Sequence, residues 1–575
     1  MIGFHSRPFR AAPLFLLPFF LAGAAPARST VEYRLAPVSD GGALSEVAVD
    51  IRMRADADGE TILELPNEYG GVKQHWRYLS PLVVTGATVS APSPDKRLLR
   101  SAANVPLTIR YRVKTAYVAD PEAADANPYN GAIIRPGWFA SLGEFLFVTP
   151  QGRDAEPATF SWAGWPAQWT KALSADRHTL NVADLVESSF IAGPDVQLRT
   201  RRILGGNLRL ASRGGFDWSM DGYADRVARV IDAQRRFWRD RNGDYTVTLF
   251  QLTPSVGSSS MGGTGRSHGF VQYASPDSPS DGLFRLIAHE HQHNWIPRQL
   301  GTPPAEAGSA FWFSEGFTDF YTARTLLRAG LWTPQQFADD LNRTLVGIAA
   351  LPPGNYPNGR IVAQFWSDPS VGQLPYDRGH LFAHLLDWQL RRAGKAGLDA
   401  VMFAMHRRWK AAPANAKPKL TGNLLAVLDS QQFDARPLIA KHIEAGVPVQ
   451  LPAELFGKCA SVVQTSIPVF DVGFDREASA KAGAFAGVDP RGAAYAAGLR
   501  DGMKRVARLG GQEGDFRVPL RYRVSDGRSE RVVSWLPEGK ELLTLQEVRV
   551  LQASSRCRSQ LSGGTQGSLR PPRHR

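Results

Sequence analysis

Three histidines and a glutamate lie within five residues in the stretch LIAHEHQHNW (residues 286–295). The spacing of its apolar residues predicts a helix over residues 283–296, which the following proline ends. Each residue of a helix turns by about 100°, so His289 and His293 lie one turn apart on the same face, where both imidazoles can bind one metal ion. His291 lies about 160° away from both and is predicted to take no part.

The pattern H-E-x-x-H is typical of zinc-dependent hydrolysis, with the glutamate as general base. Glu290 follows the first predicted ligand and can reach a metal-bound water without binding the metal itself. The alternative is a solvated cluster of polar residues. Two further features of the chain argue against that alternative.

The first feature is a candidate third ligand, since hydrolytic zinc sites commonly use three protein ligands and leave one position for water. Glu315, in FWFSEGFTDFY, lies 22 residues after His293 among apolar neighbours. A second helix antiparallel to the first would bring Glu315 to the metal. Asp319 would lie on the same face and accept a hydrogen bond from a ligand imidazole. The alternatives are a carboxylate at a helix N-terminus for Glu315 and a surface acid for Asp319.

The second feature is a candidate stabiliser for the negative charge that develops on a peptide carbonyl oxygen during hydrolysis. Tyr376, in LPYDRGHLFAHLL, fits this role by context. His380, one turn later, and His268, in a glycine-rich loop, are rival candidates. The alternative for Tyr376 is an aromatic residue packed at the start of a helix.

These residues need elements to position them, and the pattern along the chain predicts several domains. Residues 28–212 alternate apolar and polar side chains at period two, as in EVAVDIRMRA, and are predicted to form an all-β domain. Residues 213–455 predict a mixed α+β domain with a small sheet followed by a helical lobe. Short strands return over residues 459–557, around a loop, an alanine-rich helix and a glycine turn.

The first 27 residues are predicted to be an export signal, because a positive start precedes the apolar run PLFLLPFFLA and small-residue cleavage sites. The alternative is an uncleaved membrane anchor. No later segment reaches about 18 consecutive apolar residues, so no stable membrane span is expected once the signal is removed. A periplasmic or secreted protein is therefore expected.

The chain has two cysteines, Cys459 and Cys557, which bracket the C-terminal segment. In an oxidising compartment they are predicted to pair, and two buried thiols are the alternative. The net charge of +13 is partly carried by the signal and by a basic tail over residues 558–575, which is predicted to be disordered. No interleaved basic and aromatic module is present, so a nucleic-acid partner is not expected.

Together, HEHQHNW, SEGFTDFY, YDRG and GVDPRGAAYAAGLRDG resemble the glycyl aminopeptidase family of gluzincin zinc metallopeptidases. The resemblance implies an N-terminal β domain, a thermolysin-like catalytic domain and a C-terminal PDZ domain. It implies one zinc ion per chain, and matches His289, His293 and Glu315 to the ligands. Glu290 matches the catalytic base and Tyr376 the transition-state tyrosine.

One motif departs from the family, whose members usually carry G-G-L-E-H before the zinc helix, with a glutamate that helps to anchor the substrate's amino group. In MGGTGRSHG, Gly262 and Gly263 remain, but Gly265 occupies the position of the glutamate. Without this carboxylate an ammonium group loses a charged partner, and Arg266 is expected to repel it. An endopeptidase becomes an alternative to an aminopeptidase. Gly262 and Gly263 can still pair with an extended peptide, and His268 is a further candidate for substrate contact.

The C-terminal segment is predicted to be PDZ-like, with DVGFD as a candidate carboxylate-binding loop. Two functions are therefore considered. The first is an exported zinc metallopeptidase that acts on peptides or proteins through a water activated by Glu290. The alternative is a peptide-binding PDZ protein with a vestigial metallopeptidase domain. The complete set of ligands argues for the first function.

Overall fold

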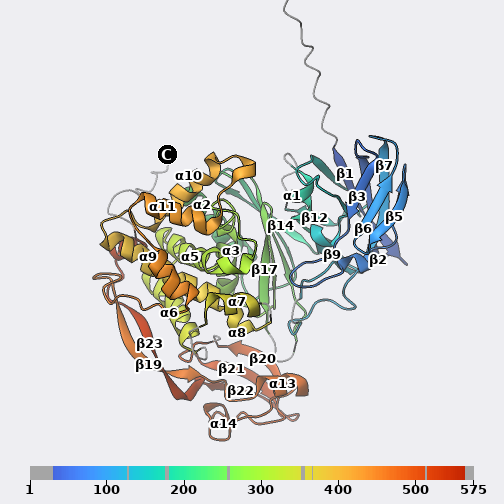
Figure 1. The fold of residues 1–575 in the computed structure, drawn as a ribbon. Helices are drawn as coiled ribbons and strands as arrows, with labels where there is room; N and C mark the ends of the chain where they lie inside the picture. The colour runs from blue at the N-terminus through green and yellow to red at the C-terminus, as the bar shows by residue number, and fades with distance from the viewer. Residues whose placement is uncertain are drawn as a thin grey trace, which may run out of the picture.

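The structure, a computed structural model, describes residues 30–125, 128–174, 180–255, 259–350, 356–365, 367–511 and 514–563. The predicted export signal, residues 1–27, lies outside the described residues, as do residues 564–575 of the predicted tail. Figure 1 shows the β-rich N-terminal part beside a central part in which helices cover a sheet, with a smaller C-terminal part below.

The N-terminal part is a set of three sheets around one apolar core, in agreement with the predicted all-β fold. Alternation of buried and exposed residues, clearest in β7 (Pro106–Lys114), turns one face of each long strand towards this core. The strand orders are β11-β1-β2-β7-β4, β10-β3-β6-β5 and β12-β13-β9-β8. The remaining elements are β1 (Val31–Asp40), β2 (Ala43–Arg54), β3 (Glu60–Glu64), η1 (His75–Tyr78), β4 (Val83–Thr85), β5 (Thr88–Ser93), β6 (Lys96–Arg100), β8 (Ile133–Arg135), β9 (Trp138–Leu142), η2 (Gly143–Phe145), β10 (Thr149–Pro150), β11 (Ala158–Trp162), β12 (Thr170–Leu173), α1 (Val182–Val186) and β13 (Ser189–Gly193).

A five-stranded sheet forms the base of the central part, in the order β14-β15-β16-β18-β17. Its strands are β14 (Gln197–Ile203), β15 (Gly206–Arg213), β16 (Tyr245–Gln251), β17 (Met261–Arg266) and β18 (Gly269–Ala274), and helix α2 (Met220–Trp238) connects β15 to β16. The predicted boundary at residue 212 differs from this arrangement. β14 and β15 belong to the central sheet because β15 pairs with β16 in parallel, a long-range contact that strand periodicity does not reveal.

Helices cover this sheet. Gly316, the first residue of α5 (Gly316–Arg328), and Gly379 of α9 (Leu374–Arg392) let these two helices approach closely. A Cβ on Gly316 would lie 2.3 Å from the Cα atom of Gly379. This contact brings the starts of both helices together. The helical elements are α3 (Ser280–Gln292), η3 (Ala307–Ala310), α4 (Phe311–Ser314), α5 (Gly316–Arg328), α6 (Pro334–Ala350), α7 (Asn358–Gln364), α8 (Pro369–Gly372), α9 (Leu374–Arg392), α10 (Leu398–Ala411), η4 (Ala414–Ala416), α11 (Leu420–Ser430), α12 (Arg436–Ile439) and the π-helical turn η5 (Ala440–Glu444). Among the described residues, no helix is long and apolar enough to cross a membrane.

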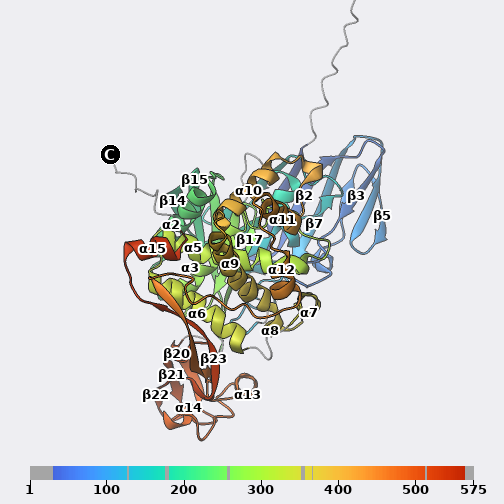
Figure 2. The same ribbon diagram turned by 60° about the vertical axis from the view of Figure 1, so that its left-hand side comes forward.

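The C-terminal part has a small apolar core of its own. A two-stranded antiparallel arm connects it to the rest of the molecule, as Figure 2 shows. The arm pairs β19 (Ala460–Phe470) with β23 (Glu538–Val550), and the amide of Asn342 on α6 exchanges hydrogen bonds with the backbone of Val548. Beyond it lie β20 (Lys504–Gly510), β21 (Leu520–Ser525), β22 (Glu530–Trp535), α13 (Arg476–Ala482) and α14 (Ala493–Ala496).

Cys459 and Cys557 form a disulfide between the base of this arm and α15 (Ser555–Leu561). Arg558 lies inside α15, so the predicted tail begins later than residue 558. The backbone of Ser562 accepts hydrogen bonds from Arg324 and Arg328, which fixes the end of α15 against α5.

Candidate active site and metal centre

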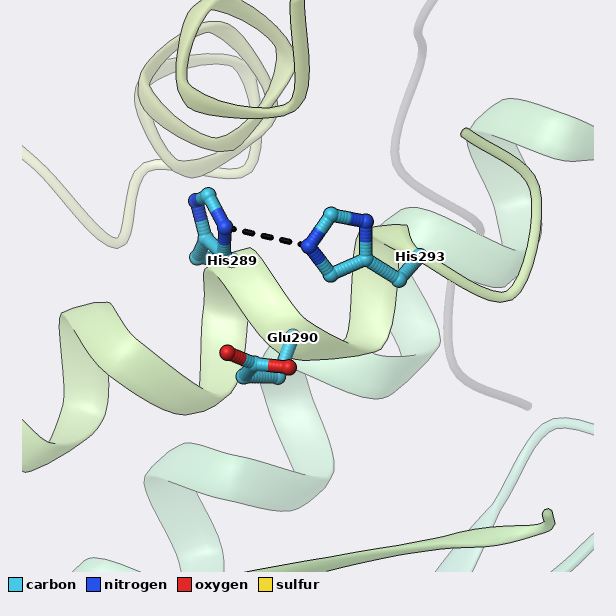
Figure 3. A group of neighbouring side chains, drawn as sticks. All are labelled: His289, Glu290 and His293. Carbon is cyan, nitrogen blue, oxygen red and sulfur yellow. Dashed lines mark hydrogen bonds between the residues drawn. The ribbon is translucent and has the colours of Figure 1, made fainter. Parts of the chain in front are cut away.

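The H-E-x-x-H segment lies at the end of α3, which stops four residues earlier than the predicted helix. The difference arises because residues 293–300 continue as turns. His293 nevertheless keeps helical dihedral angles, φ −62° and ψ −14°, and its N–H donates to the carbonyl of Glu290. Its imidazole therefore stays one turn from that of His289, and Figure 3 shows the two rings facing each other.

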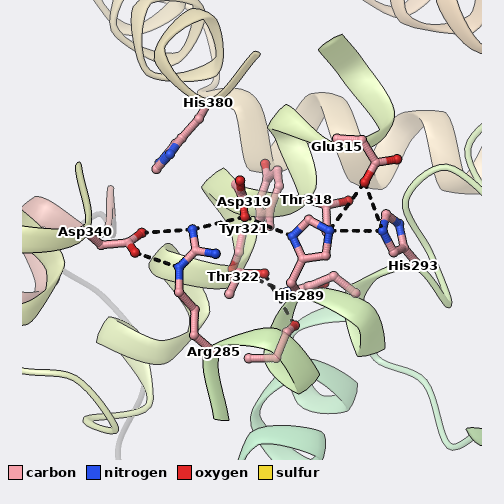
Figure 4. Close-up of polar contacts among 12 residues, drawn as sticks. Arg285, His289, His293, Glu315, Thr318, Asp319, Tyr321, Thr322, Asp340 and His380 are labelled. Carbon is pink, nitrogen blue, oxygen red and sulfur yellow. Dashed lines mark hydrogen bonds and ion pairs between the residues drawn. The ribbon is translucent and has the colours of Figure 1, made fainter. Parts of the chain in front are cut away.

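Three ligand atoms converge beside this turn (Figure 4). The Nε2 atoms of His289 and His293 lie 3.1 Å apart, and the Oε2 atom of Glu315 lies 3.4 Å from the first and 3.2 Å from the second. Zinc bound tetrahedrally at 2.0–2.1 Å separates its ligand atoms by about 3.3 Å. The donor set and its spacing therefore fit a zinc ion.

The hydrogen bonds behind the two rings indicate which nitrogen atoms are free. His293 Nδ1 lies 2.7 Å from the carbonyl oxygen of Ile296, which can only accept, so Nδ1 carries the proton. His289 Nδ1 lies 2.9 Å from Asp319 Oδ1 in the same arrangement. In neutral rings both Nε2 atoms then present lone pairs to each other and to Glu315. Three such acceptors at this distance fit a cation between them.

Glu315 lies between α4 and α5, where the structure turns its carboxylate towards the two imidazoles. Its Oε1 atom accepts a hydrogen bond of 3.0 Å from Ser314, which leaves Oε2 for the site. Burial alone would raise the pKa of Glu315, but the neighbouring His293 and His289 outweigh it and hold this pKa far below its usual range. The carboxylate is therefore ionised and ready to bind a cation.

Asp319 belongs to a buried network of ion pairs that the sequence analysis did not include. Arg285 donates to Asp319 Oδ1 at 3.1 Å and to Asp340 Oδ1 at 2.6 Å. Although burial opposes it, Arg285 and His289 lower the pKa of Asp319. Arg285 lies four residues before His289 on the same helix face, a spacing that could have indicated its role. Asp340 comes from α6, and no local pattern points to it.

Glu290 turns away from the contact between the imidazoles and towards β17. It still belongs to the cluster, because one ligand atom from each of His289, Glu290 and His293 lies within 4.8 Å of the others. A Cβ placed on Gly265 would lie 3.1 Å from its Oε2 atom. The position that carries a glutamate in the resembled family therefore faces Glu290 directly, and here it has no side chain.

Tyr376 lies near the start of α9 with its ring stacked on His289, at 5.9 Å between centroids and 29° between planes. Burial, together with the charges of Glu315 and Glu290, raises the pKa of Tyr376 well above its ordinary value. The phenol therefore keeps its proton and can donate a hydrogen bond beside the metal position.

The two rival candidates lie elsewhere. His380 is almost fully buried, and its Nδ1 atom lies 3.2 Å from Thr344 Oγ1, on the side of Asp340 in Figure 4. His268 occupies the two-residue turn between β17 and β18 with φ 52°. Among the described residues, His268 makes no hydrogen bond, ion pair or ring contact with the three ligands, and its carbonyl oxygen accepts from the N–H of Thr246. His291 is bonded to Gln234 at 2.6 Å in the core, away from the ligand face, as its helical position predicts.

The glycine strand β17, which contains Gly262 and Gly263, is the edge strand of the central sheet next to α3. Arg266 at its end forms an ion pair with Glu144 of the N-terminal part and donates to Tyr69 Oη at 2.9 Å. The expectation that Arg266 repels a substrate ammonium is therefore wrong, because its charge is paired with that of Glu144. Glu144 and Tyr69 were missed since they lie more than 100 residues away in the sequence.

Comparison with known proteins gives one family match within this site. Residues 282–356 match the M61 glycyl aminopeptidase family. The matched segment contains His289, Glu290, His293, Glu315 and Asp319. The match confirms the resemblance that HEHQHNW and SEGFTDFY indicated, and the predicted enzyme class, a peptidase. No curated protein sequence matches the chain.

Similar solved structures support the fold. An aminopeptidase N family protein from Idiomarina loihiensis aligns at 16% identity over 93% of this chain and 99% of that chain, with a TM-score of 0.64. An M1 zinc metallopeptidase from Deinococcus radiodurans aligns at 17% identity over 74% of this chain and 95% of that chain, with a TM-score of 0.46. The first likeness extends over nearly the whole length of both chains, so the multidomain arrangement is shared.

Proposed function

We propose that this chain is an exported zinc-dependent metallopeptidase that hydrolyses peptide bonds. The observation that carries the proposal is the convergence of three ligand atoms, from His289, His293 and Glu315, at the spacing of zinc ligands. The family match over the same residues supports a peptidase. A vestigial site is not favoured, because the ligands and the base are all present.

Each residue of the site has a separate role in the proposed hydrolysis. Bound zinc would polarise the peptide carbonyl and acidify a water molecule. Glu290 accepts a proton from the attacking water and passes it to the leaving amine. Tyr376, which keeps its proton, donates a hydrogen bond to the oxygen that becomes negative. Asp319 orients the ring of His289 through the hydrogen bond to Nδ1.

The glycine at position 265 supports endopeptidase activity as a second candidate beside aminopeptidase activity. A carboxylate at this position would lie next to Glu290 and could bind a substrate ammonium, but Gly265 offers only backbone. Without a side chain in the way, a peptide can continue past this point. Mass spectrometry of a peptide library incubated with the zinc-loaded protein separates the two candidates, because an aminopeptidase removes single N-terminal residues.

Export rests on the N-terminal signal sequence and agrees with a protein that uses its only two cysteines in a disulfide. A periplasmic or secreted location is proposed on this basis. A PDZ-like character is proposed for the C-terminal part because of its GVDPRGAAYAAGLRDG motif.

The Glu290→Gln variant tests the mechanism. It removes the base but no ligand, so the variant is expected to retain about one zinc per chain while turnover falls by a factor of about a thousand or more. Zinc content by atomic emission and initial rates on the same preparation measure both properties. Unchanged peptidase rates in a zinc-loaded variant would refute the role of Glu290.

A further inference from the structure

A cavity of about 210 Å³ lies where α15 packs on α5 and α9 (Figure 2). None of the residues that line it is a ligand of the metal centre. α5 begins directly after Glu315, and α9 carries Tyr376 near its start, so the cavity lies between later turns of the two helices that reach the active site. The residues used below line it from these helices: Phe320, Arg324, His384, Asp387 and Arg391.

The walls of this cavity are largely aromatic. Phe320, Phe337 and Phe456 surround the imidazole of His384, with ring centroids 4.7, 6.0 and 5.8 Å from its own. Trp388 also lines the cavity. A cavity of about 150 Å³ among apolar side chains is large enough for benzene. This cavity therefore has room for one aromatic ring with a small polar group attached.

Two residues of the lining hold a buried nitrogen atom that the protein does not use. Nη2 of Arg324 and Nε2 of His384 have no hydrogen-bond partner among the described residues. Only 2% of Arg324 and 5% of His384 is exposed. Burial keeps the pKa of His384 well below its ordinary value, so the imidazole adds a polar atom but no charge. Buried N–H groups without an acceptor are rare in folded proteins, and they indicate a place where a further group binds.

The ion pairs around the cavity leave one positive charge in excess. Arg324 pairs through Nη1 with Asp387 at 3.2 Å and with Asp399 at 3.6 Å. Arg391 pairs with Asp387 at 3.1 Å, and Arg328 pairs with Asp399 at 2.6 Å. Three guanidinium groups thus share two carboxylates. The excess matches a monoanion, and the carboxylate of Asp387 in the lining disfavours a dianion such as phosphate.

We propose that this cavity is a binding site for a small monocarboxylate attached to an aromatic ring, the chemical class of benzoate and phenylacetate. The carboxylate accepts a hydrogen bond from Nη2 of Arg324, and the ring lies among the phenylalanine side chains. A bound ligand joins α15 to the two helices that begin at the active site. Binding needs no turnover, so the proposal does not depend on the proposed peptidase function.

The test titrates benzoate, benzamide and acetate separately into the full zinc-loaded chain and follows each ligand by NMR. Benzoate is expected to bind about tenfold more tightly than benzamide, because its hydrogen bond to the guanidinium is assisted by charge. Acetate lacks the ring and should bind more weakly than benzoate. Equal affinities for benzoate and benzamide, or no saturable binding of benzoate, would overturn the proposal.

A carboxylate can also bind to zinc, so a variant has to locate the benzoate. Leu455 is half-buried in the lining, and Leu455→Phe fills part of the space without removing a charge. This variant should bind benzoate about tenfold more weakly. The matched control is Leu438→Phe, at a half-buried leucine of α12 outside the lining, which should bind benzoate as the wild type does. Unchanged affinity in Leu455→Phe would place the benzoate elsewhere and also overturn the proposal.

The Arg324→Lys variant tests the polar partner. It keeps the positive charge beside Asp387 but removes Nη2, so the preference for benzoate over benzamide should fall to within about twofold. Arg392→Lys, at an exposed position outside the lining, should keep the preference. A full preference in folded Arg324→Lys would contradict the assigned contact. If Arg324→Lys does not fold, the comparison of Leu455→Phe with Leu438→Phe still decides whether the cavity is the site.

Discussion

Glu144, in the N-terminal β-rich part, forms an ion pair with Arg266, the last residue of the glycine strand β17. Arg266 also donates from Nε to the carbonyl oxygen of its neighbour Gly265, at 2.6 Å. The N-terminal part thus contacts the strand that faces Glu290 through this guanidinium and through the Tyr69 hydroxyl, which lies 2.7 Å from Thr264 Oγ1. These contacts give the β-rich part a role in positioning the strand that is predicted to pair with substrate.

The Glu144→Gln variant is expected to weaken substrate binding without loss of zinc. A neutral amide leaves the buried Arg266 without a countercharge, so β17 should become less well positioned and KM should rise about tenfold. Steady-state kinetics and zinc analysis measure the two properties. In a double-mutant cycle with Arg266→Gln, the pair of changes should cost less than the sum of the single ones, and strict additivity would argue against the coupling.

The Asp319→Asn variant is expected to bind zinc about 10- to 100-fold more weakly. Asp319 fixes the proton of His289 on Nδ1, and an amide can present its N–H there instead, which favours the wrong tautomer. Competition with a chromogenic zinc chelator measures the affinity. Asp339→Asn, on α6 and bonded only to Gln335 in the described structure, is the control. Equal affinity in Asp319→Asn and wild type would remove Asp319 from the site.

Asp377 is expected to make the protein less stable as the pH rises. Burial, with the charges of Asp319 and Asp340, raises the pKa of Asp377 from 3.8 to about 8. Between about pH 4 and pH 8 the unfolded chain has lost this proton while the folded chain keeps it, so the free energy of unfolding falls across this interval.

In the Asp377→Asn variant the side chain at this position cannot ionise, so the variant should be more stable than wild type at high pH. Near pH 4 the two proteins should be equally stable. By pH 8 the gain should reach an order of a few kcal/mol. Thermal unfolding at both pH values measures it, and the exposed Glu541→Gln serves as the control. A difference that does not grow with pH would contradict the raised pKa.

The disulfide is expected to stabilise the fold of the C-terminal arm and to leave the catalytic activity unchanged. It closes a segment between two cysteines 98 residues apart, and such links contribute typically about 2–4 kcal/mol. A variant with both cysteines replaced by serine should unfold at lower urea concentration, yet cleave a tripeptide at the wild-type rate at 25 °C. Identical urea midpoints for oxidised and reduced wild-type protein would show that the link contributes nothing.

Much of the metal centre could be predicted from the sequence because helical geometry is local. The four-residue spacing of His289 and His293 places both imidazoles on one face wherever the helix lies, and it excludes His291 for the same reason. Glu315 and Tyr376 were less constrained, since their motifs name the residues but do not bring them to the helix. The end of α3 was misplaced because a proline marks where a helix must have stopped, and helices can end earlier.

The sequence by itself determined which side chains could bind a metal, since this follows from residue type and from the short period of a helix. The glycine-rich stretch before the zinc helix has no strand periodicity, and only the structure shows it as strand β17. Only the tertiary structure decided how these side chains meet. Three contacts join residues that are far apart in the chain: Gly316 with Gly379, Arg285 with Asp340, and Glu144 with Arg266. Such contacts depend on how whole elements pack, and no local pattern of residues encodes them.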